Sequence, residues 1–273
     1  MPTPYPQKEL RFWHGLLGLL MGVLVMIALV FTFGFVSQTI IQTPLYVTLA
    51  VQTVLVFIAF VTGAAYPVLS NRNRFADVLS MRGAPPVFFV VAIVGVLFAG
   101  ALCDEAASLL HRWKPDFFSL GTMKEIADTM TTVGPVGFVV LTVALSLFPA
   151  VGEEVMFRGL VLRSFRRDMP IHFAVIYSSI LFGLVHFSWL QGTAAALLGC
   201  FLGVLVIFSG SIYPAMVAHL VNNISWCLLS RYEPTFMADV LSEGHSWQVL
   251  GVCTLVVSAS VALMWKFRVP RHH

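Results

Sequence analysis

Phe148-Pro-Ala-Val-Gly-Glu-Glu-Val-Met-Phe-Arg158 places two adjacent carboxylates and an arginine directly after an apolar run. Read as an α-helix, the stretch puts Glu154 and Arg158 four residues apart on one face, with the acid on the N-terminal side, which is the favourable order for an ion pair. Glu153 lies about 100° away around the helix. We therefore expect Glu154 and Arg158 to be paired, and Glu153 to be free for chemistry.

The composition places this stretch in a membrane. Of the 273 residues, 58% are hydrophobic and only 11% are charged, and the mean hydropathy is +0.88. Soluble domains carry about 25% charged residues, so the chain is predicted to be a polytopic membrane protein. Ionisable groups at membrane depth are energetically expensive and are taken as functional by default.

The apolar segments predict an all-α fold of about eight transmembrane helices with an intramembrane cavity, and residues 1–273 are expected to form a single transmembrane domain. The segments are 12–36, 45–69, 86–102, 133–150, 173–187, 192–208, 212–229 and 247–267. Several are close to the lower limit of the about 17 to 25 residues that a bilayer requires. No aspartate lies within these ranges. In the sixth segment, Gly199 and Gly203 have the four-residue spacing that permits close helix packing.

The positions of Lys and Arg predict the orientation. With both termini in the cytoplasm, only Arg112, Lys114, Lys124 and Arg231 lie outside, and the other 12 of the 16 basic residues lie on or towards the cytoplasm, as the positive-inside rule requires. The loop 104–132 is then outside, with its amphipathic part at the interface. The short tails fit a prokaryotic plasma membrane. The net charge of +3 and the pI near 8.8 reflect cytoplasmic loops, so no nucleic-acid partner is expected.

Two later apolar segments carry further polar pairs at helical spacing. These are Phe182-Gly-Leu-Val-His186 and His219-Leu-Val-Asn-Asn223, in each of which the first and last residues share a helix face. Three helices can therefore direct Glu153, His186, His219 and Asn223 to one point, whereas Asn222 is expected to face away and to serve packing. Each motif alone also has a structural explanation, as an ion pair, an aromatic belt or an interhelical hydrogen bond.

The order E-E-x-x-x-R, F-x-x-x-H and H-x-x-x-N resembles the CPBP family of intramembrane endopeptidases, which includes the type II CAAX prenyl endopeptidases and the bacterial abortive infection proteins. The resemblance covers residues 130–230, which would form the catalytic core. It implies hydrolysis of peptide bonds in membrane-associated or prenylated, CAAX-type substrates. The expected partners are a peptide or lipidated protein and the lipid bilayer.

The expected mechanism uses water activated by a glutamate. Glu153 is the expected general base, and His186 holds the same water. The resemblance implies that His219 and Asn223 stabilise the oxyanion, while Glu154 and Arg158 fix the helix so that Glu153 faces inward. No cofactor is expected. The alternative is a zinc ion at Glu153, His186 and His219, with water in the fourth position.

Other protease chemistries lack their motifs. The sequence contains neither H-E-x-x-H nor G-x-S-x-G, and no pair of aspartates lies in the predicted spans. The four cysteines have no C-x-x-C spacing, so neither a disulfide framework nor a zinc ribbon is indicated. Two alternatives to an enzyme remain: a transporter or proton relay that uses the same polar residues, and a membrane scaffold without catalysis.

Overall fold

The computed structural model describes residues 10–71, 79–233 and 247–270, and every regular element in these ranges is a helix. The elements are α1 (Phe12–Val36), η1 (Ser37–Ile41), α2 (Leu45–Ser70), α4 (Pro86–Trp113), α5 (Gly121–Thr132), α6 (Pro135–Glu153), η2 (Glu154–Val161), α7 (Leu162–Asp168), α8 (Ile171–Leu184), α9 (Trp189–Ser209), α10 (Tyr213–Tyr232) and α12 (Trp247–Lys266). The elements η1 and η2 are π-helical.

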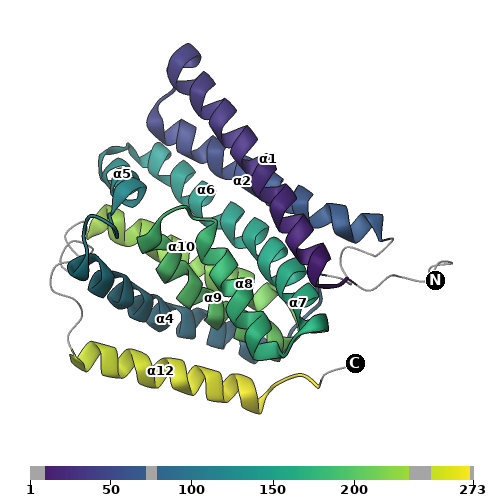
Figure 1. Cartoon of the computed structure of the whole chain (residues 1–273). Coiled ribbons are helices and arrows are strands. Elements are labelled where there is room, and N and C mark those ends of the chain that lie inside the picture. Colours follow the sequence, from purple (N-terminus) through teal and green to yellow (C-terminus); the bar gives the residue numbers. More distant parts are fainter. Residues whose placement is uncertain (1–9, 72–78, 234–246, 271–273) are drawn as a thin grey trace.

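The long helices run between two ends of the molecule (Figure 1). One end, here called the basic end, carries the starts of α1, α4, α8 and α10 and the ends of α2, α9 and α12. The opposite end carries the short helix α5 and is called the α5 end. Prolines in the first turn open α4, α6 and α10, because proline has no N–H to leave unpaired there.

Six of the described helical segments are long and apolar enough to cross a membrane. They are Phe12–Ile41, Leu45–Ser70, Pro86–Trp113, Pro135–Asp168, Trp189–Ser209 and Trp247–Lys266. Of the two other predicted spans, α8 is apolar but has only 14 residues, and α10 has 20 residues but carries several polar side chains. The all-α polytopic membrane fold is confirmed, and the predicted number of eight spans is approximate.

The third span is longer than predicted. The sequence placed its end at residue 102, whereas α4 continues to Trp113 and takes in Asp104 and Glu105. Glu105 is buried, and Arg112 bonds its carboxylate at 3.2 Å, while Ser108 accepts a second bond from Arg112 at 3.0 Å. The statement that no aspartate lies within a span was therefore wrong. The helix tolerates the buried Glu105 because Arg112, two turns later, supplies a hydrogen-bond donor.

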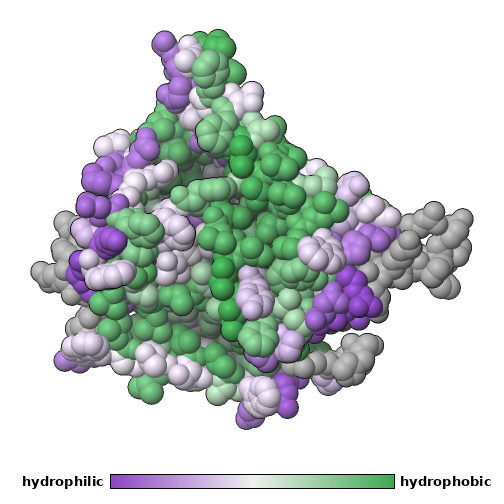
Figure 2. Space-filling view, viewed as in Figure 1, coloured by the Kyte–Doolittle hydropathy of each residue, from purple (hydrophilic) through white to green (hydrophobic). Residues whose placement is uncertain are grey.

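The outer surface agrees with a membrane environment. In Figure 2 hydrophobic side chains cover the middle of the visible face, and hydrophilic ones gather towards the basic end and the α5 end. Large apolar side chains such as Phe31, Val136 and Leu255 are at least 71% exposed. Water would disfavour so much contiguous apolar surface, whereas lipid does not.

Candidate active site

The two adjacent glutamates lie where the helix changes its geometry. Glu153 ends α6, and Glu154 begins the π-helical segment η2, in which all eight residues are buried. Both glutamates are almost completely withdrawn from solvent, with relative residue exposures of 9% and 0%. Single π-helical turns inside α-helices occur often at functional sites. Here the wider turn lies directly after Glu153.

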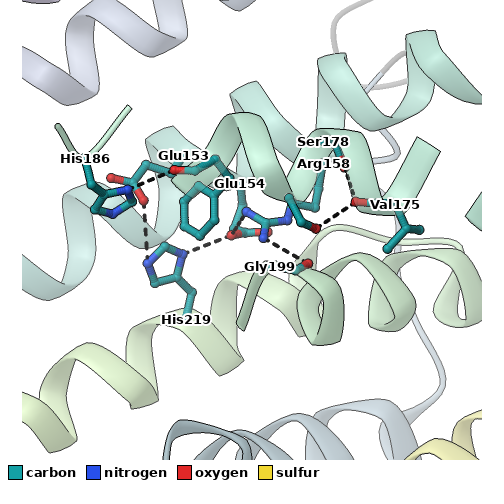
Figure 3. Close-up of polar contacts among 10 residues, drawn as sticks. Glu153, Glu154, Arg158, Val175, Ser178, His186, Gly199 and His219 are labelled. Atoms are coloured by element: carbon teal, nitrogen blue, oxygen red, sulfur yellow. Dashed lines mark hydrogen bonds and ion pairs between the residues drawn. The ribbon is translucent and has the colours of Figure 1, made fainter. Parts of the chain in front are cut away.

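Glu154 connects two cationic or potentially cationic side chains. Its Oε1 accepts a hydrogen bond from Arg158 Nη1 at 2.8 Å, in the ion pair that their spacing predicts, and lies 2.9 Å from Nδ1 of His219 (Figure 3). Oε1 of Glu154 accepts a hydrogen bond from Arg158 and acts as an acceptor towards His219 as well. Nδ1 of His219 therefore carries the proton in this contact. The sequence predicted only that Glu154 fixes its own helix by pairing with Arg158. The structure shows that Glu154 also orients the imidazole ring of His219.

His219 also faces the other glutamate. Its Nε2 lies 3.7 Å from Oε2 of Glu153, which is an ion-pair distance but longer than a hydrogen bond. His219 thus stands between the two carboxylates, with Nδ1 towards Glu154 and Nε2 towards Glu153 (Figure 3). The contact with Glu154 holds the imidazole ring through Nδ1, and Nε2 remains directed towards Glu153.

His186 is held in one tautomer by the end of α8. Its Nδ1 lies 2.8 Å from the backbone carbonyl of Phe182, which can only accept, so the proton is on Nδ1 and Nε2 keeps its lone pair. Phe182 packs edge-on against both His186 and His219, and its ring face receives Arg158 with the guanidinium carbon 4.3 Å from the centroid. The phenylalanine of the F-x-x-x-H motif therefore contacts the arginine and both histidines.

Asn223 bonds to the backbone of the helix that carries Glu153. Its Nδ2 donates to the carbonyl of Leu145 at 3.2 Å. Pro149 lies four residues after Leu145 and has no N–H, so that carbonyl has no partner in its own helix. Asn223 supplies the missing donor and fixes α10 against α6 near the site. Its Oδ1 accepts from the amide of Asn222 at 3.3 Å.

These side chains line one cavity of about 500 Å³. Glu153, His186, His219 and Asn223 all border it, so the structure brings the four predicted site residues together. The helices that carry the three motifs do not enclose the cavity alone, because α1, α2, α4, α5 and α9 contribute to the wall as well.

Asn222 does not face away as predicted. It lines the same cavity as Asn223 and bonds to it, and its Oδ1 approaches Gly100 of α4. Trp226, one turn further along α10, also borders the cavity, and its Nε1 is buried without a hydrogen-bond partner among the described residues. Its spacing of seven residues from His219 was the signal that could have identified it as a residue of the same helix face.

Close approach of α8 and α9 positions His186. A Cβ added to Gly183 would meet the carbonyl oxygen of Gly192 at 2.3 Å, so only glycine fits at this crossing. The predicted pair Gly199 and Gly203 also faces α8, against Ser179 and Val175 respectively. Small residues thus allow the two backbones to pack closely along their length. The end of α8 that carries His186 is therefore fixed by backbone contact.

Metal ligands are the alternative use of the same side chains. In the part of the chain that the structure describes, no group of three or more His, Cys, Asp or Glu side chains is arranged to hold a metal ion. Nδ1 of both histidines is engaged, with Phe182 in one case and Glu154 in the other, so a metal would have to bind Nε2 of each. The absence of a metal remains a prediction.

The fold and the site define an integral, multi-pass membrane protein with buried carboxylates and histidines around an intramembrane cavity. Residues 135–225 match the family model described as type II CAAX prenyl endopeptidase Rce1-like. The match confirms the resemblance drawn from the three motifs, and the matched segment contains all four candidate site residues. It supports a protease that processes CAAX-type substrates. Comparisons with curated proteins and with solved structures give no match.

Proposed function

We propose that the protein is an intramembrane endopeptidase in which Glu153 activates water for attack on a peptide bond of a membrane-associated or prenylated substrate. The observation that carries this proposal is the convergence of Glu153, His186, His219 and Asn223 on one cavity within an apolar helical bundle. Arg158 bonds to Glu154, and no arginine among the described residues is paired with Glu153. It is therefore the group available as a base.

Glu153 and His186 together would hold the nucleophile. A water molecule between them donates one hydrogen bond to the Glu153 carboxylate and the other to Nε2 of His186, which has its lone pair free. Glu153 takes the proton as the water oxygen bonds to the substrate carbonyl carbon. When the carbon–nitrogen bond breaks, the same proton passes to the leaving nitrogen, and the second water hydrogen stays on the new carboxylic acid. Transfer of that proton to the amine then gives a carboxylate and an ammonium group as the products.

His219 and Asn223 would stabilise the oxyanion of the tetrahedral intermediate. Asn223 uses one amide hydrogen for the carbonyl of Leu145 and keeps the second for the oxyanion. Donation from His219 requires a proton on Nε2. With that proton, the set formed by Glu153, Glu154, Arg158 and His219 carries two negative and two positive charges, which avoids a net charge inside the bundle.

A transporter or proton relay is the second candidate function. The contact of His219 with both glutamates favours it, because such a chain of titratable groups is also what proton transfer needs. The cavity separates the two functions, since a proton path requires polar groups continuing to the basic end. Beyond Arg158, the rest of η2 is the buried stretch Gly159, Leu160 and Val161, which carries no titratable side chain. A scaffold without catalysis makes no use of the cavity.

Peptide hydrolysis by the pure protein in detergent tests the proposal. Prenylated and unmodified peptides of the same sequence are incubated with the full chain, with Glu153→Gln, and with Glu125→Gln as a matched control that removes an exposed carboxylate on α5. The expected result is product with the full chain and with Glu125→Gln, and none with Glu153→Gln. Equal product from all three, or from none, would contradict the proposal. The ratio of the cleavage rates of the prenylated and the unmodified peptide decides whether the prenyl group is recognised.

A further inference from the structure

Asn222 borders the cavity although the proposed reaction makes no direct use of it. It comes directly before Asn223 on α10, and its side chain is half-buried in the wall that also contains Glu153 and His219. Among the described residues, its amide forms one hydrogen bond, in which Nδ2 donates to Oδ1 of Asn223 at 3.3 Å. Polar side chains within membrane helices are expensive, so a use for this amide is to be expected.

The amide of Asn223 is held at both of its polar atoms. Its Nδ2 donates to the carbonyl of Leu145 on α6 at 3.2 Å, and its Oδ1 accepts from Asn222. The terminal torsion of an asparagine side chain is broad, so the rotamer alone does not set the plane of the amide. The bond to Leu145 places the amide nitrogen, and the bond from Asn222 fixes the plane around it. The second hydrogen on Nδ2 then has one direction.

A glycine on the neighbouring helix makes room for Asn222. The helices α4 and α10 are packed together (Figure 1), and Gly100 of α4 faces the amide of Asn222. A Cβ added to Gly100 would lie 2.9 Å from Oδ1 of Asn222, which is shorter than van der Waals contact. Apart from the backbone of its own helix, it would meet no other atom within 4 Å. The position of the Asn222 amide therefore depends on α4 as well as on α10.

We propose that Asn222 is a positioning residue, which fixes the amide of Asn223 so that its second hydrogen points to the oxyanion, and that Gly100 leaves the space in which Asn222 does so. The oxyanion role rests on the proposed peptidase function, whereas the fixing of the amide does not. A donor that is already oriented stabilises the developing charge without turning during the reaction. Asn222 thus contributes through Asn223 and without contact with the substrate.

A double-mutant cycle on kcat tests whether Asn222 acts through Asn223. Asn222→Ala is expected to lower kcat by up to about 10², the effect of misplacing a group at the site by about 1 Å, and to leave KM nearly unchanged. In a chain that already carries Asn223→Ala, the same change should have no further effect, because the group that it positions is gone. Equal factors in the two backgrounds, an unchanged kcat, or a rise in KM alone would overturn the proposal.

Gly100→Ala reaches Asn222 from the other helix. The added methyl group displaces only the end of a flexible side chain, so Tm should stay close to that of the unmodified chain. The bond from Asn222 to Asn223 is at the long end of the range for N–H···O contacts, and this displacement is expected to break it. The value of kcat should therefore fall as it does in Asn222→Ala.

Combining Gly100→Ala with Asn222→Ala should lower kcat no further, because the shorter side chain leaves room for the methyl group. The matched control is Gly251→Ala on α12, where an added Cβ meets no atom within 4 Å, and its kcat and Tm should be normal. Full activity of Gly100→Ala would overturn the proposal. So would a rise in KM with an unchanged kcat, because the methyl group would then act by obstructing the peptide.

The side-chain amides report the same contact without any substrate. The sequence has four asparagines, Asn71, Asn73, Asn222 and Asn223, so full-length protein labelled with ¹⁵N in asparagine alone gives few side-chain signals in a nuclear magnetic resonance spectrum. The signals of Asn223 are identified by their loss in Asn223→Ala. They should shift in Asn222→Ala and in Gly100→Ala and stay in place in Gly251→Ala. Asn223 signals that stay in place in all three variants would overturn the proposal.

Failure of the positioning role and failure of the peptidase function give different results. If the unmodified chain cleaves peptide and the double-mutant cycle is additive, only the positioning role is refuted. If the unmodified chain cleaves no peptide, the peptidase function and the oxyanion role are both refuted. The amide spectrum then still decides whether Asn222 fixes the amide of Asn223.

Discussion

The side-chain amide of Asn223 donates a hydrogen bond of 3.2 Å to the backbone carbonyl of Leu145, across 78 residues of sequence. The carbonyl is available because Pro149, one turn later, has no N–H to donate. A proline within α6 and an asparagine within α10 therefore satisfy a requirement that neither helix meets alone. The bond also fixes the amide whose second hydrogen we assign to the oxyanion.

Loss of Asn223 should reduce turnover more than binding. Asn223→Ala is expected to lower kcat by about 10² to 10³, which is the usual effect of removing one oxyanion donor. KM should change little, because this hydrogen bond strengthens in the transition state. Steady-state kinetics on a cleaved peptide measure both quantities. A fully active Asn223→Ala protein would disprove the assignment.

Pro149→Ala serves as the companion variant for Asn223. Alanine restores an N–H that competes with Asn223 for the Leu145 carbonyl, so the anchor of Asn223 is weakened while both of its amide hydrogens remain. The expected result is an unchanged or higher Tm and a kcat reduction smaller than that of Asn223→Ala. Equal reductions would mean that Asn223 acts by joining the helices and not by donating to substrate. Asn222 is no neutral control, because it bonds to Asn223.

The two adjacent glutamates should respond differently to substitution, beginning with Glu153. Glu153→Gln keeps the shape of the side chain and removes the base, so cleavage should be abolished while expression and Tm stay near those of the unmodified chain. Thermal unfolding in detergent and the peptide assay measure the two effects. A large fall in Tm would show that Glu153 is needed for folding, which would weaken its assignment as the base.

Removal of Arg158 should damage the fold. Its guanidinium bonds to Glu154 and to the carbonyl of Gly199, and it packs on Phe182. Arg158→Ala leaves a buried carboxylate without its cation, which typically costs about 3 to 5 kcal/mol. Folded yield after solubilisation, measured by size-exclusion chromatography, should fall strongly. A normal yield combined with lost activity would instead assign Arg158 to the reaction.

The α8–α9 crossing should tolerate no side chain. In Gly183→Ala the new Cβ would lie 2.3 Å from the carbonyl oxygen of Gly192, so the end of α8 and His186 must move. We expect loss of activity together with a lower Tm. Gly251→Ala on α12, where an added Cβ meets no atom within 4 Å, is the matched control and should retain both. Normal activity of Gly183→Ala would show that the crossing can relax without displacing His186.

Chelators should leave the activity unchanged. The proposed mechanism needs no ion, since Glu153 and His186 hold and activate the water. Pure protein treated with a strong zinc chelator is therefore expected to keep its rate, and elemental analysis should find no stoichiometric zinc. Activity that is lost on chelation and restored by zinc would favour the alternative ligand set of Glu153, His186 and His219.

The membrane class and the family resemblance of the three motifs could be predicted from the sequence because they depend on local properties. Hydropathy over a window of residues identifies a span regardless of what packs against it. The pairing of Glu154 with Arg158 is also local, since both lie within one turn of the same chain segment. The family match over residues 135–225 agrees with these local patterns.

Helix rotation and the composition of the cavity wall were decided only by the tertiary structure. Spacing gives the angle between two side chains on one helix, but not the angle of that helix to its neighbours, and for this reason Asn222 was wrongly placed outside the site. The contacts of His219 with Glu154 and of Asn223 with Leu145 join segments 65 and 78 residues apart, which no local pattern encodes. They form because buried polar groups must find partners wherever packing brings them together.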